Sequence, residues 1–209
     1  MMLGMPVCFI VGAAILPVDV VWVISWCAVI AVLALSSWVL REQVRVELWI
    51  AAVVGWLGVW VMSGVNFPPM SWRYLAPVGM GSCFAVYVIM TRCMSGEGTM
   101  VKLFHTALWV FAALTFVMPF LWKTPTARVL IIYTFIGIIG FFVLFFLDRA
   151  IEMAPVAKTA PIIYTVPIWY CLQDCIINGK LPGTMPVVGA LIIGASFVFL
   201  RMDGSFGRV

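Results

Sequence analysis

Charged residues are scarce in this sequence, and their scarcity argues against a soluble protein. Asp, Glu, Lys and Arg make up only 10% of the 209 residues, whereas soluble globular domains carry about 25%. Hydrophobic residues account for 65% of the chain, and the mean hydropathy is +1.18. So few charges cannot cover a surface in contact with water. The composition therefore predicts a protein embedded in a lipid bilayer.

The sequence also lacks the alternation of apolar and polar residues that is typical of a membrane β-barrel. In the run from Val129 to Leu147, odd and even positions are both mostly apolar. Because backbone N–H and C=O groups cannot remain unpaired in hydrocarbon, such runs must pair these groups within one segment, as helices do. We therefore expect an all-α integral membrane protein.

Signatures of catalysis and metal binding are lacking as well. His105 is the single histidine, and no nucleophile, phosphate-loop or zinc-protease pattern accompanies it. Cys171 and Cys175 share a helix face, but no further soft ligand nearby completes a metal site. The net charge of +4 is spread along the loops. We therefore expect no enzyme activity, metal, cofactor or nucleic-acid partner.

Apolar segments of about 20 residues, the length that crosses a bilayer, fill most of the chain. Cutting at charges, prolines and glycine clusters yields eight of them: 1–16, 18–40, 46–64, 74–92, 103–122, 128–147, 155–177 and 184–201. Most connections are of the order of ten residues or fewer, so successive helices are expected to be antiparallel neighbours in one bundle. About eight transmembrane helices are predicted.

Basic residues divide unevenly between alternate loops. One side holds Arg41, Arg45, Arg92, Lys102, Arg149, Lys158, Arg201 and Arg208, and the other holds Arg73, Lys123, Arg128 and Lys180. Lys and Arg concentrate in cytoplasmic loops. We therefore expect the first group to face the cytoplasm, together with the C-terminus, in a protein of the cell membrane.

A weak internal repeat appears when the chain is shifted by 138 positions. Pro17-Val18 then aligns with Pro155-Val156, and Ala52 with Ala190, without any gap. The order of helix, polar turn and second helix is kept, as in transporters built from repeated units. The repeat predicts a first unit of three helices at 1–64, a second unit of five helices at 74–201, and a cytoplasmic tail at 202–209.

The offset has a consequence for the first unit. Segments 74–92 and 103–122 have no counterparts, and Met1 aligns with Ile139 in the middle of a segment. We therefore expect a longer natural version to carry two further spans upstream, in about 70–80 residues.

Short motifs at the repeat positions resemble the EamA family of the drug/metabolite transporter superfamily. Leu40-Arg41-Glu42 stands where that family has an L-G-E turn, Gly55 and Gly58 match its spaced glycines, and Pro167 matches a proline in its later unit. Val29 and Lys180 depart from the pattern, which has Pro and Glu at these positions. The resemblance implies ten helices in two inverted five-helix units, of which this chain lacks the first two helices.

One helix face is the predicted substrate pathway. At 100° per residue, a polar and aromatic stripe forms along segment 155–177; it comprises Lys158, Ile162, Thr165, Trp169 and Gln173. Trp26, deep in segment 18–40, is a further candidate. Two alternatives remain open: Lys158 extends to the lipid headgroups, and Thr165 bonds to its own helix.

Two other groups of residues have predicted roles. Asp148, Arg149 and Glu152 end segment six, either as a charge-neutralising cluster at the interface or as a gate that pairs with Lys158. Small residues allow close contact between helices in membranes, and four glycines are assigned this role: Gly55, Gly58, Gly189 and Gly194.

These observations favour a secondary transporter of a small organic metabolite or drug-like compound that works by alternating access. The alternative is a truncated or partner-dependent membrane protein without transport activity of its own. Its expected partners are the lipid bilayer and a small-molecule substrate, and association with a second copy of the chain stays open.

Overall fold

The computed structural model describes residues 2–67, 69, 71–121, 124–179 and 183–202, and every regular element in these ranges is helical. The first helices are α1 (Gly4–Ile15), α2 (Val18–Ser25), α3 (Ala28–Val39) and α4 (Val46–Ser63). They are followed by the 3₁₀ turn η1 (Trp72–Tyr74), α5 (Leu75–Cys93), α6 (Thr99–Leu121) and α7 (Ala127–Met153). The last elements are α8 (Val156–Thr159), the 3₁₀ segment η2 (Ala160–Tyr164), α9 (Thr165–Asn178) and α10 (Thr184–Met202).

In the described residues, these elements form eight rod-like segments, as the sequence predicts. Three of these rods combine consecutive elements: α2 with α3, η1 with α5, and α8 with η2 and α9. Six stretches are long and apolar enough to cross a bilayer, and α1 and α10 are shorter apolar helices. The prediction of an all-α integral membrane protein is confirmed. Two bounds differ from expectation, because α6 begins at Thr99 and α7 continues to Met153. Charged side chains lie within these extra turns because they pair with one another, as described below.

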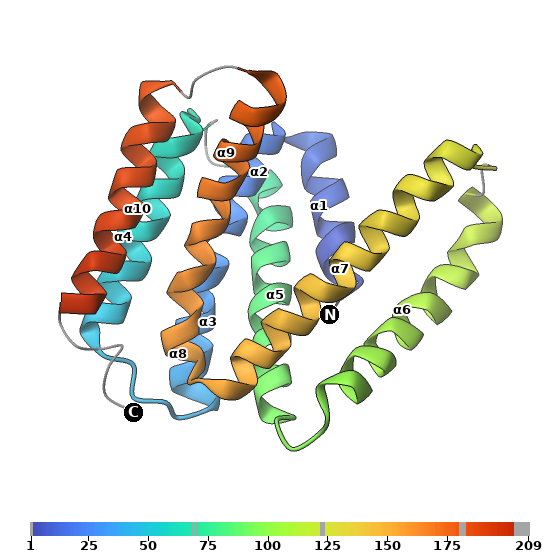
Figure 1. Ribbon diagram of the computed structural model, residues 1–209, viewed down its shortest axis with the longest axis horizontal. Coiled ribbons are helices and arrows are strands. Elements are labelled where there is room, and N and C mark those ends of the chain that lie inside the picture. Colours follow the sequence, from blue (N-terminus) through green and yellow to red (C-terminus); the bar gives the residue numbers. More distant parts are fainter. Residues whose placement is uncertain (1, 68, 70, 122–123, 180–182, 203–209) are drawn as a thin grey trace.

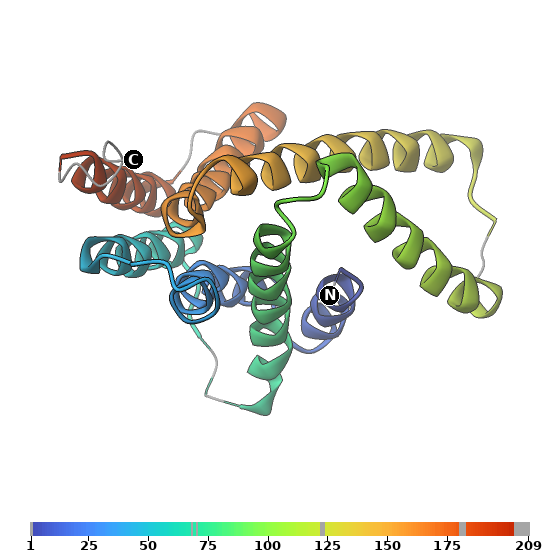
Figure 2. The ribbon, with the colours of Figure 1, turned by 90° about the horizontal axis from the view of Figure 1, so that it is seen from below.

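Most rods pack side by side, but α6 and α7 do not. Figures 1 and 2 show α4 against α10, α3 beside α8, and α5 beside α1, whereas α6 and α7 form a hairpin that splays away from the bundle. Apolar side chains along α7 are exposed, including Ile131 and Phe135. Apolar surface of this extent requires a hydrocarbon environment.

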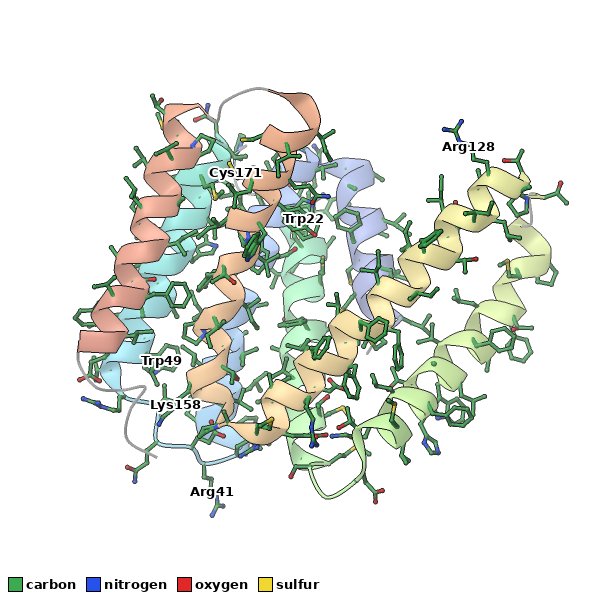
Figure 3. All side chains as sticks on the ribbon, viewed as in Figure 1. Trp22, Arg41, Trp49, Arg128, Lys158 and Cys171 are labelled. Carbon is green, nitrogen blue, oxygen red and sulfur yellow. The ribbon has the colours of Figure 1, made fainter. Side chains whose placement is uncertain are left out.

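The rods run between two ends of the bundle (Figure 1). The Arg41 end carries the loop 40–45, the end of α5 and the start of α8; the Pro17 end carries the starts of α2 and α5. Figure 3 shows Arg41 and Lys158 at the first end and Arg128 at the second, as the sequence predicts. Which end faces the cytoplasm stays a prediction. Lys123, Lys180, Arg208 and residues 203–209 of the predicted tail lie outside the described residues.

Two of the rods are interrupted near their middle, which corrects the expectation of continuous helices. Between α2 and α3, the N–H of Cys27 donates to the carbonyl of Ile24, three residues back, in a tightened turn. Between α8 and α9, Pro161 lies in η2, where it supplies no N–H for a helical hydrogen bond. The predicted stripe assumed one continuous α-helix from Lys158 to Gln173, and the 3₁₀ segment η2 interrupts that helix.

Glycines set the closest helix contact, between α4 and α10. A Cβ on Gly189 would lie 2.5 Å from the carbonyl oxygen of Gly58, and a Cβ on Gly58 would lie 2.7 Å from Ile193. A Cβ on Gly55 would meet the ring of Tyr164 at 2.6 Å. Three of the four predicted contact glycines thus allow close approach, whereas the Cβ position of Gly194 has nothing within 4 Å.

The helix bounds keep the 138-residue offset of the sequence. Ile15 and Met153 end α1 and α7, Val18 and Val156 begin α2 and α8, and α4 and α10 begin at residues 46 and 184. Trp26 and Tyr164, also 138 positions apart, are in contact. The division into units 1–64 and 74–201 stays a prediction.

Candidate functional site

The bundle contains a cavity of about 380 Å³ toward the Pro17 end, which we call the aromatic cavity. Asp19, Trp22 and Trp26 line it at α2, Tyr170 and Cys171 line it from α9, and α4 and α10 close the remaining sides. Figure 3 labels Trp22 and Cys171 in this part of the bundle. The volume falls within the range of about 300–1,000 Å³ that is usual for small-molecule sites.

Aromatic rings define the walls of this cavity. Trp22 and Trp26 lie four residues apart on one helix face, with ring centroids 6.5 Å apart and planes inclined by 26°. The ring of Tyr170 lies 5.9 Å from Trp22, and the ring of Tyr164 lies 6.3 Å from Trp26. The cavity therefore offers ring faces from α2 and α9 to a flat or cationic ligand.

The interruption between α2 and α3 helps to hold these rings in place. Because the N–H of Cys27 turns to Ile24, the carbonyl of Val23 accepts a hydrogen bond from the indole N–H of Trp56 at 3.0 Å. The hydroxyl of Tyr164 donates to the carbonyl of Trp26 at 3.4 Å. Carbonyl groups at the break thus tie α2 to α4 and to the neighbouring η2 segment.

Asp19 is the one charged side chain among the described residues that line the aromatic cavity. It lies in the first turn of α2, where the positive end of the helix dipole favours a carboxylate. Its side chain is exposed at the mouth of the cavity. A carboxylate beside aromatic faces suits a ligand that carries positive charge.

A smaller apolar cavity of about 160 Å³ lies on the other side of the same tryptophans. Met5, Met80 and Phe84 line it, together with Trp22 and Trp26. The two indoles therefore form a wall between the two cavities.

At the Arg41 end, Glu42 links the loop after α3 to the start of α8. Its carboxylate accepts hydrogen bonds from the backbone N–H groups of Val156 at 3.2 Å and Ala157 at 3.0 Å. The preceding residue, Pro155, supplies no side-chain cap. Glu42 therefore caps α8 from a distant part of the chain and joins the loop after α3 to α8 at this end of the bundle.

The charged group at the end of α7 contacts α5 and α6. The hydroxyl of Tyr87 donates to the carboxylate of Asp148 at 2.7 Å. Glu152 forms ion pairs with Lys102 and, at 3.1 Å, with Arg149. These are the contacts of a charge-neutralising cluster, as one of the two sequence hypotheses holds. The other hypothesis placed Lys158 as their partner.

The five predicted pathway residues do not lie together. Trp26 lines the aromatic cavity, whereas Thr165 borders a separate apolar cavity between α7 and α9 and donates to the carbonyl of its neighbour Ile162. Lys158 is half-buried at the Arg41 end. The exposed Trp169 and Gln173 lie on the face of α9 opposite the residues that line the aromatic cavity. Their role in transport stays a prediction.

Sequence analysis missed two residues of the aromatic cavity. Tyr170 lies one position from the predicted stripe, and one position corresponds to about 100° around a helix. Asp19 follows Pro17-Val18 at the start of a long apolar segment, and nothing in the local sequence marks it as a cavity residue. The pair Trp22 and Trp26 was the usable signal, because aromatic residues four apart share a face.

In the described part of the chain, no group of three or more His, Cys, Asp or Glu residues could hold a metal ion. Cys171 lines the aromatic cavity as a small apolar side chain. The cavity offers rings, one carboxylate and small polar groups. Such a lining can bind a ligand but supplies no pair of nucleophile and base.

No protein-family model matches the chain. It is similar to the S-adenosylmethionine uptake transporter of Rickettsia prowazekii (strain Madrid E), with 27% identity over 191 residues, 90% of this chain. Its similarity to the S-adenosylmethionine uptake transporter of Rickettsia felis is 26% over 190 residues. The chain spans 65% of the length of each relative. These names describe transport and no chemical reaction, which supports the expectation that the chain is not an enzyme.

One solved crystal structure resembles the whole chain. It superimposes with a TM-score of 0.80 at 16% sequence identity, and covers 100% of this chain and 75% of that chain. A match at this identity shows the fold. The helical arrangement described above is therefore one that an experimentally determined protein also adopts.

Proposed function

We propose that this chain works in the uptake of S-adenosylmethionine or a closely related cationic metabolite, and that the aromatic cavity is its substrate site. The observation that carries the proposal is the lining of this cavity: three aromatic rings, Trp22, Trp26 and Tyr170, with a single carboxylate, Asp19. The names of the relatives supply the candidate substrate.

The chemistry of S-adenosylmethionine fits this lining. Its adenine is flat and aromatic and can stack on an indole face, as bases do on aromatic side chains. Its sulfonium carries a positive charge that ring faces attract. Asp19 is placed to pair with the ammonium or the sulfonium of the substrate at the mouth of the cavity. The flat adenine and the positive charge of the molecule therefore each have a chemically matched group in the lining.

The transport mechanism that we propose is alternating access. The aromatic cavity lies toward the Pro17 end, while Glu42 ties α8 to the loop after α3 at the Arg41 end. The 138-residue offset in helix bounds supports two related units that rock against each other. On this basis we assign the chain to the EamA-like transporters, with the turn Leu40-Arg41-Glu42 as one of the closing contacts.

The same proposal includes an orientation in the cell membrane. The described basic side chains gather at the Arg41 end, which we assign to the cytoplasm together with the end of α10. The aromatic cavity then faces the outside, as uptake requires.

A partner-dependent protein is the second candidate function. It is favoured by the splayed α6–α7 hairpin, whose apolar side chains pack little against the rest of the described chain. In that case the chain binds the substrate but moves it only together with further helices. Binding and flux must therefore be measured separately.

Binding of radiolabelled S-adenosylmethionine to the purified chain in nanodiscs tests the site. Competition with S-adenosylhomocysteine, which has the same adenine and amino acid but no positive sulfonium, isolates the contribution of charge. We expect S-adenosylmethionine to bind more tightly than S-adenosylhomocysteine. Asp19→Asn should reduce the ratio of the two affinities about tenfold, which corresponds to roughly 1.4 kcal/mol.

Glu97→Gln, which removes an exposed carboxylate far from α2 in sequence, is the matched control. Wild-type protein that binds neither compound would reject the aromatic cavity as the substrate site. An unchanged preference in Asp19→Asn would reject pairing of Asp19 with the sulfonium, because both compounds carry the ammonium.

A further inference from the structure

A second polar cavity, separate from the aromatic cavity, lies near the Arg41 end between α5, α6 and α7. Its volume is about 660 Å³. The titratable side chains that line it come from α5, α6, α7 and the connecting loop: Tyr87, Glu97, Lys102, His105 and Asp148. We call it the Asp148 cavity. The substrate site described above uses none of these residues.

Asp148 is the most buried acidic group of this cavity. Asp148 is 2% exposed, and its carboxylate accepts a hydrogen bond from the neutral hydroxyl of Tyr87 at 2.7 Å. No ion pair of Asp148 is found in the part of the chain that the structure describes. A buried carboxyl group with a neutral partner is the kind of group that changes its charge by binding a proton.

The basic groups around Asp148 have other partners. Lys102 pairs with Glu152, as does Arg149. Arg92 donates to the backbone carbonyls of residues 151 and 152 at 2.9 and 2.8 Å. Glu152 is therefore the carboxylate that Lys102 and Arg149 contact, whereas the bond that Asp148 makes in the described residues is with Tyr87.

A metal cation suits this place less well than a proton does. Sodium or magnesium needs several oxygen ligands, while Asp148 has a carboxylate and the Tyr87 hydroxyl at hand. A proton needs only one carboxylate oxygen, and the Tyr87 hydroxyl can remain hydrogen-bonded to Asp148 in both charge states.

The position of Asp148 connects it to the Arg41 end of the bundle. It lies near the end of α7, and only Ala154 and Pro155 separate that helix from α8. The first N–H groups of α8 donate hydrogen bonds to the carboxylate of Glu42. A change of charge at Asp148 would therefore act on the helix that directly precedes α8, the element that Glu42 caps.

We propose that Asp148 is a proton-binding site that couples transport to a pH difference across the membrane, an inference that rests on the proposed transport function. In each cycle a proton from water on one side forms an O–H bond with the Asp148 carboxylate. The proton leaves to water on the other side after the substrate has crossed. Tyr87 positions the carboxylate, and Lys102, His105, Glu97 and Glu152 set its electrostatic surroundings.

The test uses the chain reconstituted in liposomes, with potassium and valinomycin holding the membrane potential at zero. S-adenosylmethionine counterflow, an exchange between two pools at equal pH, measures transport itself. Accumulation driven by a gradient of one pH unit measures coupling. If one proton moves per substrate, this gradient supports about tenfold accumulation in the wild type.

In the variant Asp148→Asn, the neutral amide imitates a carboxyl group that is always protonated. We expect this variant to retain counterflow and to lose the tenfold accumulation. Asp148→Glu should keep both, and so should the control Glu47→Gln, because Glu47 bonds to Arg45 and lines neither cavity. Wild-type counterflow without any response to the pH gradient would overturn the proton site and leave the proposed transport function standing. Loss of counterflow in a folded Asp148→Asn protein would also overturn it. Absence of wild-type counterflow would instead contradict the transport function.

Discussion

At the scale of single residues, Trp22 is the side chain on which the aromatic cavity most depends. It contacts Trp26 and Tyr170 within the cavity and Phe9 of α1 at 5.6 Å, and it also lines the smaller cavity behind. A ring that borders two spaces can bind a substrate and control passage between them. In the function that we propose, Trp22 therefore contacts the substrate and also borders the second cavity.

Comparison of Trp22→Ala with Trp169→Ala tests which face of the bundle carries the substrate. We expect Trp22→Ala to weaken S-adenosylmethionine binding about tenfold or more, since stacking of a base on an aromatic ring contributes roughly 1–3 kcal/mol. Trp169, which is 67% exposed on the opposite face of α9, should tolerate the same change. Binding to purified variants at matched helical content is the measurement.

The reverse result would restore the predicted stripe. If Trp169→Ala abolished binding and Trp22→Ala did not, the pathway would follow Lys158, Thr165, Trp169 and Gln173, and the aromatic cavity would be a packing feature.

At the scale of elements, the side chain of Glu42 links the loop after α3 to the start of α8. Glu42 caps a helix that begins 114 residues later in the chain, and caps of this kind contribute roughly 0.5–2 kcal/mol. A contact of this strength is weak enough to break during the transport cycle that we propose.

Glu42→Gln is expected to loosen the Arg41 end. In a cysteine-free background that carries Ala157→Cys, a water-soluble maleimide should label position 157, now buried, at least severalfold faster when Glu42 is replaced. Glu47→Gln is the control, because Glu47 bonds to the nearby Arg45 at the same end. Equal labelling rates in both variants would show that Glu42 does not hold this end closed.

At the scale of the whole molecule, the distribution of basic residues predicts orientation. Cytoplasmic loops are enriched in Lys and Arg, and Arg41 and Arg73 lie at opposite ends of the bundle. In the cysteine-free background, an impermeant reagent outside intact cells should label Arg73→Cys and leave Arg41→Cys unlabelled until the cells are permeabilised. Labelling of both positions from outside would reject the span assignment, and labelling of position 41 alone would invert it.

The eight helical segments could be predicted because each depends on its own residues. In hydrocarbon, a segment must satisfy its backbone groups internally, so apolar length alone indicates a helix. The same local logic predicted close contact at Gly55, Gly58 and Gly189. It failed at Gly194, because nothing in the sequence states which face of α10 meets α4.

The amino-acid sequence by itself determined the class of the protein, the positions of its helices and the 138-residue offset, since these follow from composition and local order. Tertiary structure alone decided that Tyr170 rather than Trp169 lines the aromatic cavity, that Glu42 caps α8, and that Asp148 bonds to Tyr87. Each of these contacts joins segments distant in sequence. Their geometry depends on how the helices rotate and pack, and on interruptions such as η2 that shift the register by a fraction of a turn.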